Sequence, residues 1–154
     1  MEQKVQSKVI AANYMHLQFP SRSENESLAR VAVAAFVTVL DPTMEQLTEL
    51  KTAVSEAVTN AIIHGYDGGE GEVRLHCALK DGTVEVVVED DGIGIEDIDQ
   101  ARQPLFTSRP ELERSGMGLT IIENFVDEFF ISSEPGRGTR VTMRKVLASS
   151  ETLN

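Results

Sequence analysis

Three polar side chains recur at helical spacing within a segment that is otherwise rich in alanine, valine and isoleucine. They are Glu56, Asn60 and His64, and a helix would stack them along one side. Burying a carboxylate, a carboxamide and an imidazole is costly unless each group is paired or binds a ligand. The Asn60 amide oxygen suits Mg²⁺, which prefers oxygen ligands, and the Glu56 carboxylate could accept a proton from a hydroxyl or a water. The alternative is that all three side chains hydrogen-bond neighbouring loops.

A D-x-G-x-G motif, containing Asp90, Gly92 and Gly94, directly follows a valine-rich segment. Glycines at such positions permit tight turns and a close approach of the backbone to a ligand. A carboxylate at a strand end could accept a hydrogen bond from an exocyclic amine such as that of adenine. The motif is common in loops, so an ordinary turn is the alternative.

A G-x-G motif opens a predicted helix, with Ser115 and Gly116 before it and Gly118 at its start. Backbone N–H groups and the helix dipole attract anions at such a position. Arg114 could reach a phosphate group, and the loop 103–115 could close over a nucleotide as a lid. A plain helix start after a flexible loop is the alternative.

Thr139 follows a glycine at the start of the last predicted strand. Its hydroxyl could hydrogen-bond the edge of a purine. The alternative is a β-hairpin in which the threonine contributes only its strand propensity.

The elements that must position these side chains follow from hydrophobic periodicity. Alternation of apolar and polar residues predicts five strands, at 14–19, 72–79, 83–89, 129–133 and 139–146. Helical spacing predicts helices at 28–40, 43–64 and 118–126, the first two preceded by capping boxes at 23–26 and 43–46. Because helices and antiparallel strands cluster along the chain instead of alternating, the fold class is α+β. We expect a two-layer α/β sandwich, with a mixed, mostly antiparallel sheet and helices on one face.

The length of 154 residues fits one domain, and an apolar share of 41% suffices for a core. We expect a flexible leader at 1–13, a domain at 14–147 and a loose tail at 148–154. No apolar run approaches the ~20 residues of a membrane helix, and the N-terminus lacks an apolar signal core, so a cytoplasmic location is expected. The net charge of −11 argues against binding to nucleic acid or to an acidic membrane. Cys77, the sole cysteine, is expected to be a buried thiol.

Arg30 is the single charge in the apolar run 28–40. From the run alone, the simpler interpretation is that its guanidinium extends to the surface. The alternative is that Arg30 marks an exposed stripe used by a partner.

The four motifs occur in the order E-x-x-x-N, D-x-G-x-G, G-x-G and G-T. This order resembles the superfamily of ATPases and kinases that includes DNA gyrase, the heat-shock chaperone with a split ATP site, MutL and the bacterial histidine kinases. The resemblance covers roughly 23–145, and the superfamily's fold, called Bergerat, is the sandwich described above. Within the superfamily, the chain resembles the sporulation anti-sigma-F serine kinases from Met15 onward, with matching strings at 23–27, 55–66, 101–107 and 110–118. Residues 1–13 and the loop 67–71 depart from the family pattern.

This resemblance implies ATP and ADP as ligands together with Mg²⁺. It makes Glu56 the general base that takes a proton from a serine hydroxyl of a protein substrate, and it makes Asn60 the Mg²⁺ ligand. Asp90 would accept the adenine amino group. The other nucleotide contacts that it implies are His64, Gly92, Gly94, Thr107, Arg114, Ser115, Gly116, Gly118 and Thr139.

The resemblance also implies two protein partners and a homodimer. The substrate would be an anti-anti-sigma factor phosphorylated on serine, and the second partner would be the sporulation sigma factor F. Arg30 would then lie in the partner-binding surface. The alternatives are the related stress-response anti-sigma serine kinase and a non-catalytic module that uses ATP only as a ligand. A histidine kinase would need an upstream helix carrying a phosphoacceptor histidine, whereas His16 lies on a predicted strand.

Overall fold

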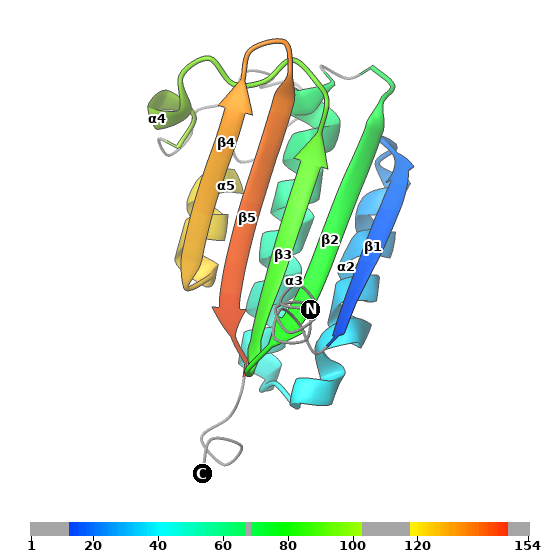
Figure 1. The fold of residues 1–154 in the computed structure, drawn as a ribbon, viewed down its shortest axis with the longest axis vertical. Coiled ribbons are helices and arrows are strands. Elements are labelled where there is room, and N and C mark those ends of the chain that lie inside the picture. The colour runs from blue at the N-terminus through cyan, green and yellow to red at the C-terminus, as the bar shows by residue number, and fades with distance from the viewer. Residues whose placement is uncertain (1–12, 67–68, 103–117, 148–154) are drawn as a thin grey trace, which may run out of the picture.

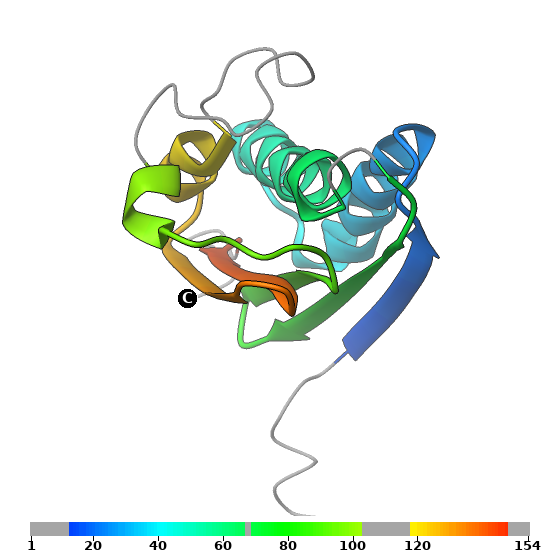
Figure 2. The ribbon, with the colours of Figure 1, turned by 90° about the horizontal axis from the view of Figure 1, so that it is seen from above.

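The computed structural model describes residues 13–66, 69–102 and 118–147. They form two layers, a twisted sheet and a layer of helices that covers one of its faces (Figures 1 and 2). The predicted α+β sandwich is confirmed. The expected leader and tail lie outside the described residues, apart from Asn13, which opens the first strand. Within the described part of the chain, no helix is long and apolar enough to cross a membrane.

The sheet contains five strands in the order β1-β2-β3-β5-β4, so that β1 is an edge strand as predicted. The strand bounds are β1 Asn13–Pro20, β2 Glu72–Lys80, β3 Thr83–Asp90, β4 Glu128–Glu134 and β5 Gly138–Val146. All four pairings are antiparallel, where a mixed, mostly antiparallel sheet was expected. For the first pair, the reason is that the helices between β1 and β2 return the chain to the end where β1 stopped, so that Pro20 pairs with Glu72.

The helical layer packs mainly through α2 and α3, with α5 beside α3 (Figure 1). The helical bounds are α2 Glu24–Phe36, the 3₁₀ turn η1 Val37–Leu40, α3 Met44–Asn60, the π-helical turn η2 Ala61–Gly65, α4 Ile98–Ala101 and α5 Gly118–Phe125. The predicted capping box of α3 is confirmed. Thr43 Oγ1 accepts from the Gln46 backbone N–H at 3.0 Å, and Gln46 Oε1 accepts from the Thr43 N–H at 2.9 Å.

The predicted capping box at 23–26 is wrong. Ser23 has helical backbone angles and makes no side-chain cap. The Glu26 carboxylate is instead used in tertiary contacts, where it accepts from Ser55 Oγ on α3 at 2.5 Å and from Arg30 Nη1 at 3.0 Å. The Glu26 carboxylate thus binds the Ser55 hydroxyl and the Arg30 guanidinium instead of capping the helix.

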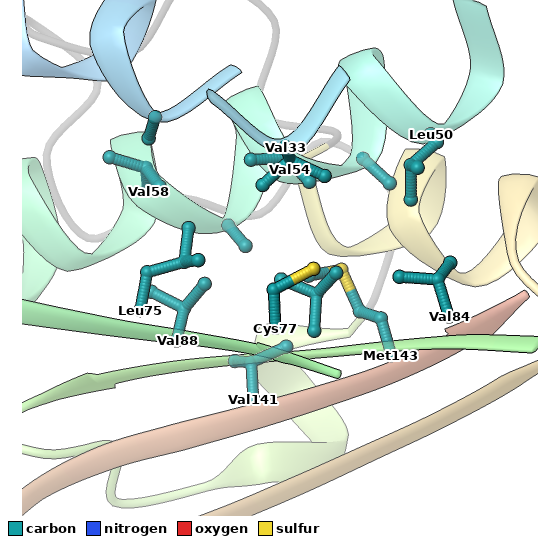
Figure 3. Packing of buried hydrophobic residues seen from close by; sticks show 14 of the residues in the cluster. Val33, Leu50, Val54, Val58, Leu75, Cys77, Val84, Val88, Val141 and Met143 are labelled. Carbon is teal, nitrogen blue, oxygen red and sulfur yellow. The ribbon is translucent and has the colours of Figure 1, made fainter. Parts of the chain in front are cut away.

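The core lies between the helices and the inner face of the sheet (Figure 3). The helix α3 turns an apolar stripe toward this layer, in which Leu50, Val54 and Val58 are fully buried. Alternate residues of β2, including Leu75 and Cys77, point into the same layer. This packing places the C-terminal end of α3, which carries Asn60, beside the end of β3 and the start of β5.

We predict that Cys77 will resist alkylation in the folded protein. The thiol is 1% exposed, and burial raises its pKa to about 12, so the reactive thiolate is suppressed. Iodoacetamide labelling followed by mass spectrometry should be slow under native conditions and rapid in denaturant. A native labelling rate equal to that of a free cysteine peptide would contradict the buried placement.

Candidate functional site

A cavity of about 390 Å³ opens where β3 ends and β5 begins. The polar side chains of Asn60, His64, Asp90 and Thr139 line it, as do Gly94 and Gly118. The structure therefore brings together residues from all four sequence motifs. The apolar part of the lining comprises Ala57, Ala61, Val88, Ile93, Ile95, Ala101, Leu119, Pro135 and Val141.

Asn60 is the last residue of α3, and its Nδ2 is buried without a hydrogen-bond partner among the described residues. A buried amide in this state is costly, and each such group needs an explanation. A ligand in the cavity would supply one, because Asn60 belongs to the lining. The chemistry of its side chain offers an oxygen to a hard cation and an N–H to an anion.

Glu56 lies one turn before Asn60 and does not line the cavity itself. It borders the cavity at the start of α5. A Cβ added at Gly118 would lie 3.0 Å from Glu56 Oε1 and 3.3 Å from both Asn60 Oδ1 and Nδ2. The carboxylate and the amide thus lie on the same side of the helix, as the spacing predicted, and both face the start of α5.

The turn after Asn60 is π-helical, which the sequence did not predict. Its last residue, Gly65, accepts a hydrogen bond on its carbonyl from the Ile93 N–H at 2.7 Å. A Cβ at Gly92 would lie 1.6 Å from that same oxygen, so only glycine permits the approach. Gly94, with φ of +79°, needs the left-handed region. The π-turn and the D-x-G-x-G motif therefore lock together, in keeping with the frequent use of π-turns at functional sites.

Asp90 ends β3 with 6% of its surface exposed, and it lines the cavity. Its Oδ1 accepts from the Gly92 N–H at 2.9 Å. Burial raises the pKa of Asp90 to about 6, the negative charge of Asp91 adds to this, and backbone hydrogen bonds from Gly92 and Thr139 oppose it. Above that pH the cavity presents a desolvated carboxylate, a strong acceptor for an amine.

Ser133 supports the site from outside the cavity lining, and the sequence analysis did not predict this role. Its hydroxyl hydrogen-bonds Thr139 Oγ1 at 2.8 Å, donates to Gly138 O at 3.0 Å, and accepts from the Ile95 N–H at 2.7 Å. It therefore ties β4 to the segment that follows Gly94. The signal was the hairpin register, which places Ser133 opposite Thr139.

The helix α4 was also missed, because the segment after Asp90 shows little periodicity. Asp97 caps it by accepting from the Gln100 N–H at 3.0 Å, and both residues line the cavity. An aspartate followed three residues later by glutamine was the available signal. With only four residues, α4 is too short for a periodic pattern to reveal.

The remaining predicted residues lie elsewhere. Thr107, Arg114, Ser115 and Gly116 fall outside the described residues. Arg30 lies on α2, does not line the cavity, and donates to Glu26 and, at 3.4 Å, to Ser55 Oγ and Ser27 Oγ. Its side chain is 36% exposed, so part of the guanidinium is accessible.

A metal ion in this site would not be held by a cluster of acidic, cysteine and histidine side chains from the described residues. Among the described residues, no group of three or more His, Cys, Asp and Glu side chains could hold one. An ion held by Asn60 would therefore take its other ligands from a bound phosphate and from water, which is how Mg²⁺ is commonly coordinated.

Comparison with known proteins identifies the family. Residues 19–145 match the model of the histidine kinase-like ATPase domain. The anti-sigma F factor of Geobacillus kaustophilus (strain HTA426) is 61% identical over 142 residues, which cover 92% of this chain and 97% of that protein. The anti-sigma F factor of Clostridium novyi (strain NT) is 57% identical over 143 residues, which cover 92% of this chain and all of that protein. The chain belongs to the anti-sigma F factor family.

Solved structures support the fold of this anti-sigma F family member. A Mycobacterium tuberculosis structure containing RsbU and RsbW domains superimposes with a TM-score of 0.64 at 22% identity, over 88% of this chain. The chain spans 33% of the length of that structure. The catalytic domain of the histidine kinase ThkA superimposes with a TM-score of 0.54 at 15% identity, over 87% of this chain and 97% of that one. At these identities the likeness concerns the fold alone.

Proposed function

We propose that this anti-sigma F family member is a Mg·ATP-dependent protein serine kinase that also sequesters a sigma factor. The observation that carries the proposal is the cavity, whose lining includes the buried carboxylate of Asp90 and the amide of Asn60, with its Nδ2 buried and without a partner among the described residues. The histidine kinase-like ATPase domain implies that a nucleotide binds. The two groups suit the base and the phosphates of that nucleotide.

The base of the nucleotide would occupy the apolar part of the cavity, beside Ala61 and Ile93. The Asp90 carboxylate would accept a hydrogen bond from the exocyclic amine of adenine. Thr139, held by Ser133, would face the same edge of the base. Gly92 and Gly94 support this arrangement because they let the loop pack against the π-turn and the β4–β5 turn. ATP and ADP would both satisfy these contacts.

The phosphates would lie near Asn60 and the start of α5, where Gly118 leaves room. Mg²⁺, when bound, would neutralise phosphate charge and orient the transferred group. Asn60 would contribute an oxygen ligand to it, and Glu56 would accept the proton of the attacking serine hydroxyl. His64, in the π-helical turn, would contact the nucleotide from its place in the cavity lining. Outside the described residues, we assign further phosphate contacts to Thr107, Arg114, Ser115 and Gly116.

The partner assignment rests on family membership. The curated relatives are named anti-sigma F factors, and we propose that this chain binds sigma factor F. We further propose an anti-anti-sigma factor as the serine substrate, a homodimeric assembly and a contact role for the accessible part of Arg30. The functional unit would be the domain at 14–147, located in the cytoplasm, without direct binding of nucleic acid or membrane.

The proposal predicts transfer of labelled phosphate to serine. The purified chain, incubated with γ-³²P-labelled ATP, Mg²⁺ and an anti-anti-sigma factor, should yield phosphoserine on hydrolysis of that partner. Chelation of Mg²⁺ should stop the transfer. A chain that binds ATP but labels no candidate partner would instead be a binding module. Capture of a stress-response sigma factor in place of sigma factor F would assign the chain to the related stress pathway.

A further inference from the structure

Asp91, the neighbour of Asp90, does not line the cavity and is held by contacts of its own. Arg74 of β2 donates to both of its carboxylate oxygens, from Nη1 to Oδ2 at 2.8 Å and from Nη2 to Oδ1 at 3.0 Å. Arg74 Nε also donates to Glu89 at 3.4 Å. A two-pronged pair of this kind fixes direction as well as distance. The hydrogen bonds to Asp91 also raise the pKa of Arg74 and lower that of Asp91, so the pair stays charged.

The peptide unit that joins Asp90 to Asp91 is held from a second direction. The Asp91 backbone N–H donates to the Tyr66 hydroxyl at 2.8 Å, and the same hydroxyl donates to Glu72 O at 2.5 Å. The Tyr66 ring packs over Gly71, where an added Cβ would lie 2.2 Å from it. Tyr66 therefore links the end of the π-turn, the start of β2 and the end of β3.

Together these contacts leave the Asp90 segment little freedom. Tyr66 directly follows Gly65, whose carbonyl accepts from the Ile93 N–H. The chain from Asp90 to Ile93 is thus fixed at the Asp91 amide, at the Asp91 carboxylate and at the Ile93 amide. Tyr66 and Arg74 do not line the cavity, so any effect they have on a ligand must pass through this segment.

We propose that Tyr66 and Arg74 are positioning residues that hold the Asp90 carboxylate toward the cavity for recognition of the exocyclic amine of adenine. The proposal rests on the proposed function, because it assumes that Asp90 reads the base. Releasing the Asp91 amide would let the preceding peptide plane rotate, and the Asp90 carboxylate would move with it. A misaligned Asp90 carboxylate would weaken its hydrogen bond to the adenine amine, and a hydrogen bond to a charged group contributes more to affinity than a neutral one.

The test uses Tyr66→Phe and Arg74→Gln in the full chain, with binding measured by calorimetry. Tyr66→Phe keeps the ring and removes only the hydroxyl, so the packing over Gly71 remains. We expect each variant to bind ATP about tenfold more weakly, which corresponds to one charged hydrogen bond. Affinity for ITP, whose base lacks the exocyclic amine, should stay unchanged. Arg144→Gln is the matched control. Arg144 is also a sheet arginine with two acidic partners, but it lies on β5 and pairs with Glu85 and Glu128 instead of Asp91.

A double-mutant cycle decides whether the effect passes through Asp90. In an Asp90→Asn background, Arg74→Gln should cause no further loss of ATP affinity. Equal weakening of ATP and ITP, unchanged ATP affinity in both single variants, or additive losses in the double variant would each overturn the proposal. A wild-type chain that binds neither nucleotide would instead refute the proposed function itself, and that result is distinguishable from these.

Discussion

Replacing Glu56 with glutamine should stop phosphate transfer and leave nucleotide affinity unchanged. Glutamine keeps the size of the side chain and so preserves the packing against Gly118, where an added Cβ would lie 3.0 Å from Glu56 Oε1. It cannot accept a proton from a hydroxyl. A general base contributes ~10²- to 10⁴-fold to the rate, so a loss of that size is expected. The measurement is single-turnover transfer of labelled phosphate to the anti-anti-sigma factor, with ATP affinity determined by calorimetry.

Glu45→Gln provides the matched control for this experiment. Glu45 is exposed and lies in the first turn of the same helix, at the end opposite to Asn60, and it does not line the cavity. Its replacement should leave the transfer rate as it is. A normal rate in Glu56→Gln would remove Glu56 from the role of base. A matching loss of ATP affinity would assign it to ligand binding instead.

The fold could be predicted from the sequence because one-sided burial dictates the hydrophobic pattern. In β2, residues Val73, Leu75, Cys77 and Leu79 are buried and their neighbours are not, as their alternation indicated. The turn between β2 and β3 is likewise set by local chemistry, since Asp81 and Gly82 both have positive φ, of 53° and 77°. Such features depend on neighbours in sequence, and the sequence displays them directly.

Features that depend on tertiary competition could not be predicted. The S-x-x-E pattern at Ser23 was a valid local cap, yet Glu26 contacts Ser55 and Arg30 instead. The π-turn after Asn60 lies where Gly65 contacts the D-x-G-x-G loop. The Gly65 carbonyl accepts from the Ile93 N–H, which is 28 positions later in the sequence. No local pattern encodes either event.

The candidate site was predicted in its polar chemistry and missed in its supports. Asn60, His64, Asp90 and Thr139 stood out because polar residues in apolar or glycine-rich surroundings are conspicuous. Ser133 and Tyr66 were missed, since a serine in a strand and a tyrosine after a helix have ordinary explanations. Their roles depend on the partners that the sheet register and the π-turn bring to them.

Asp90→Asn should weaken ATP binding by about 10- to 100-fold, since a hydrogen bond to a charged group is worth about 1.5–3 kcal/mol. The same substitution should make the ligand-free protein more stable at pH 8. In the folded state burial raises the pKa of Asp90 from 3.8 to about 6. A shift of about two units corresponds to about 3 kcal/mol, which is an upper bound for the gain because asparagine must also satisfy its N–H groups.

The sign of this effect fixes its pH window. The folded chain holds the Asp90 proton up to about pH 6, whereas the unfolded chain releases it near 3.8. Stability from this group is therefore present below pH 4, and it is lost as the pH rises to about 6. Asparagine carries no such dependence, so the difference in unfolding free energy between variant and wild type should grow across that window and then level off. Urea unfolding at pH 4, 5, 6 and 8 measures the difference, and other titrating groups cancel in the subtraction.

A difference that stays constant from pH 4 to pH 8, or a variant that is less stable at pH 8, would contradict the buried charge. The expected pattern would show that a carboxylate is kept in the cavity lining at a cost to the empty protein. Nucleotide affinity in the wild type should then decline below about pH 6, as the acceptor becomes protonated. The Asp90→Asn variant should keep only the part of the decline that comes from protonation of the phosphates, so the difference between the two proteins isolates the titration of Asp90.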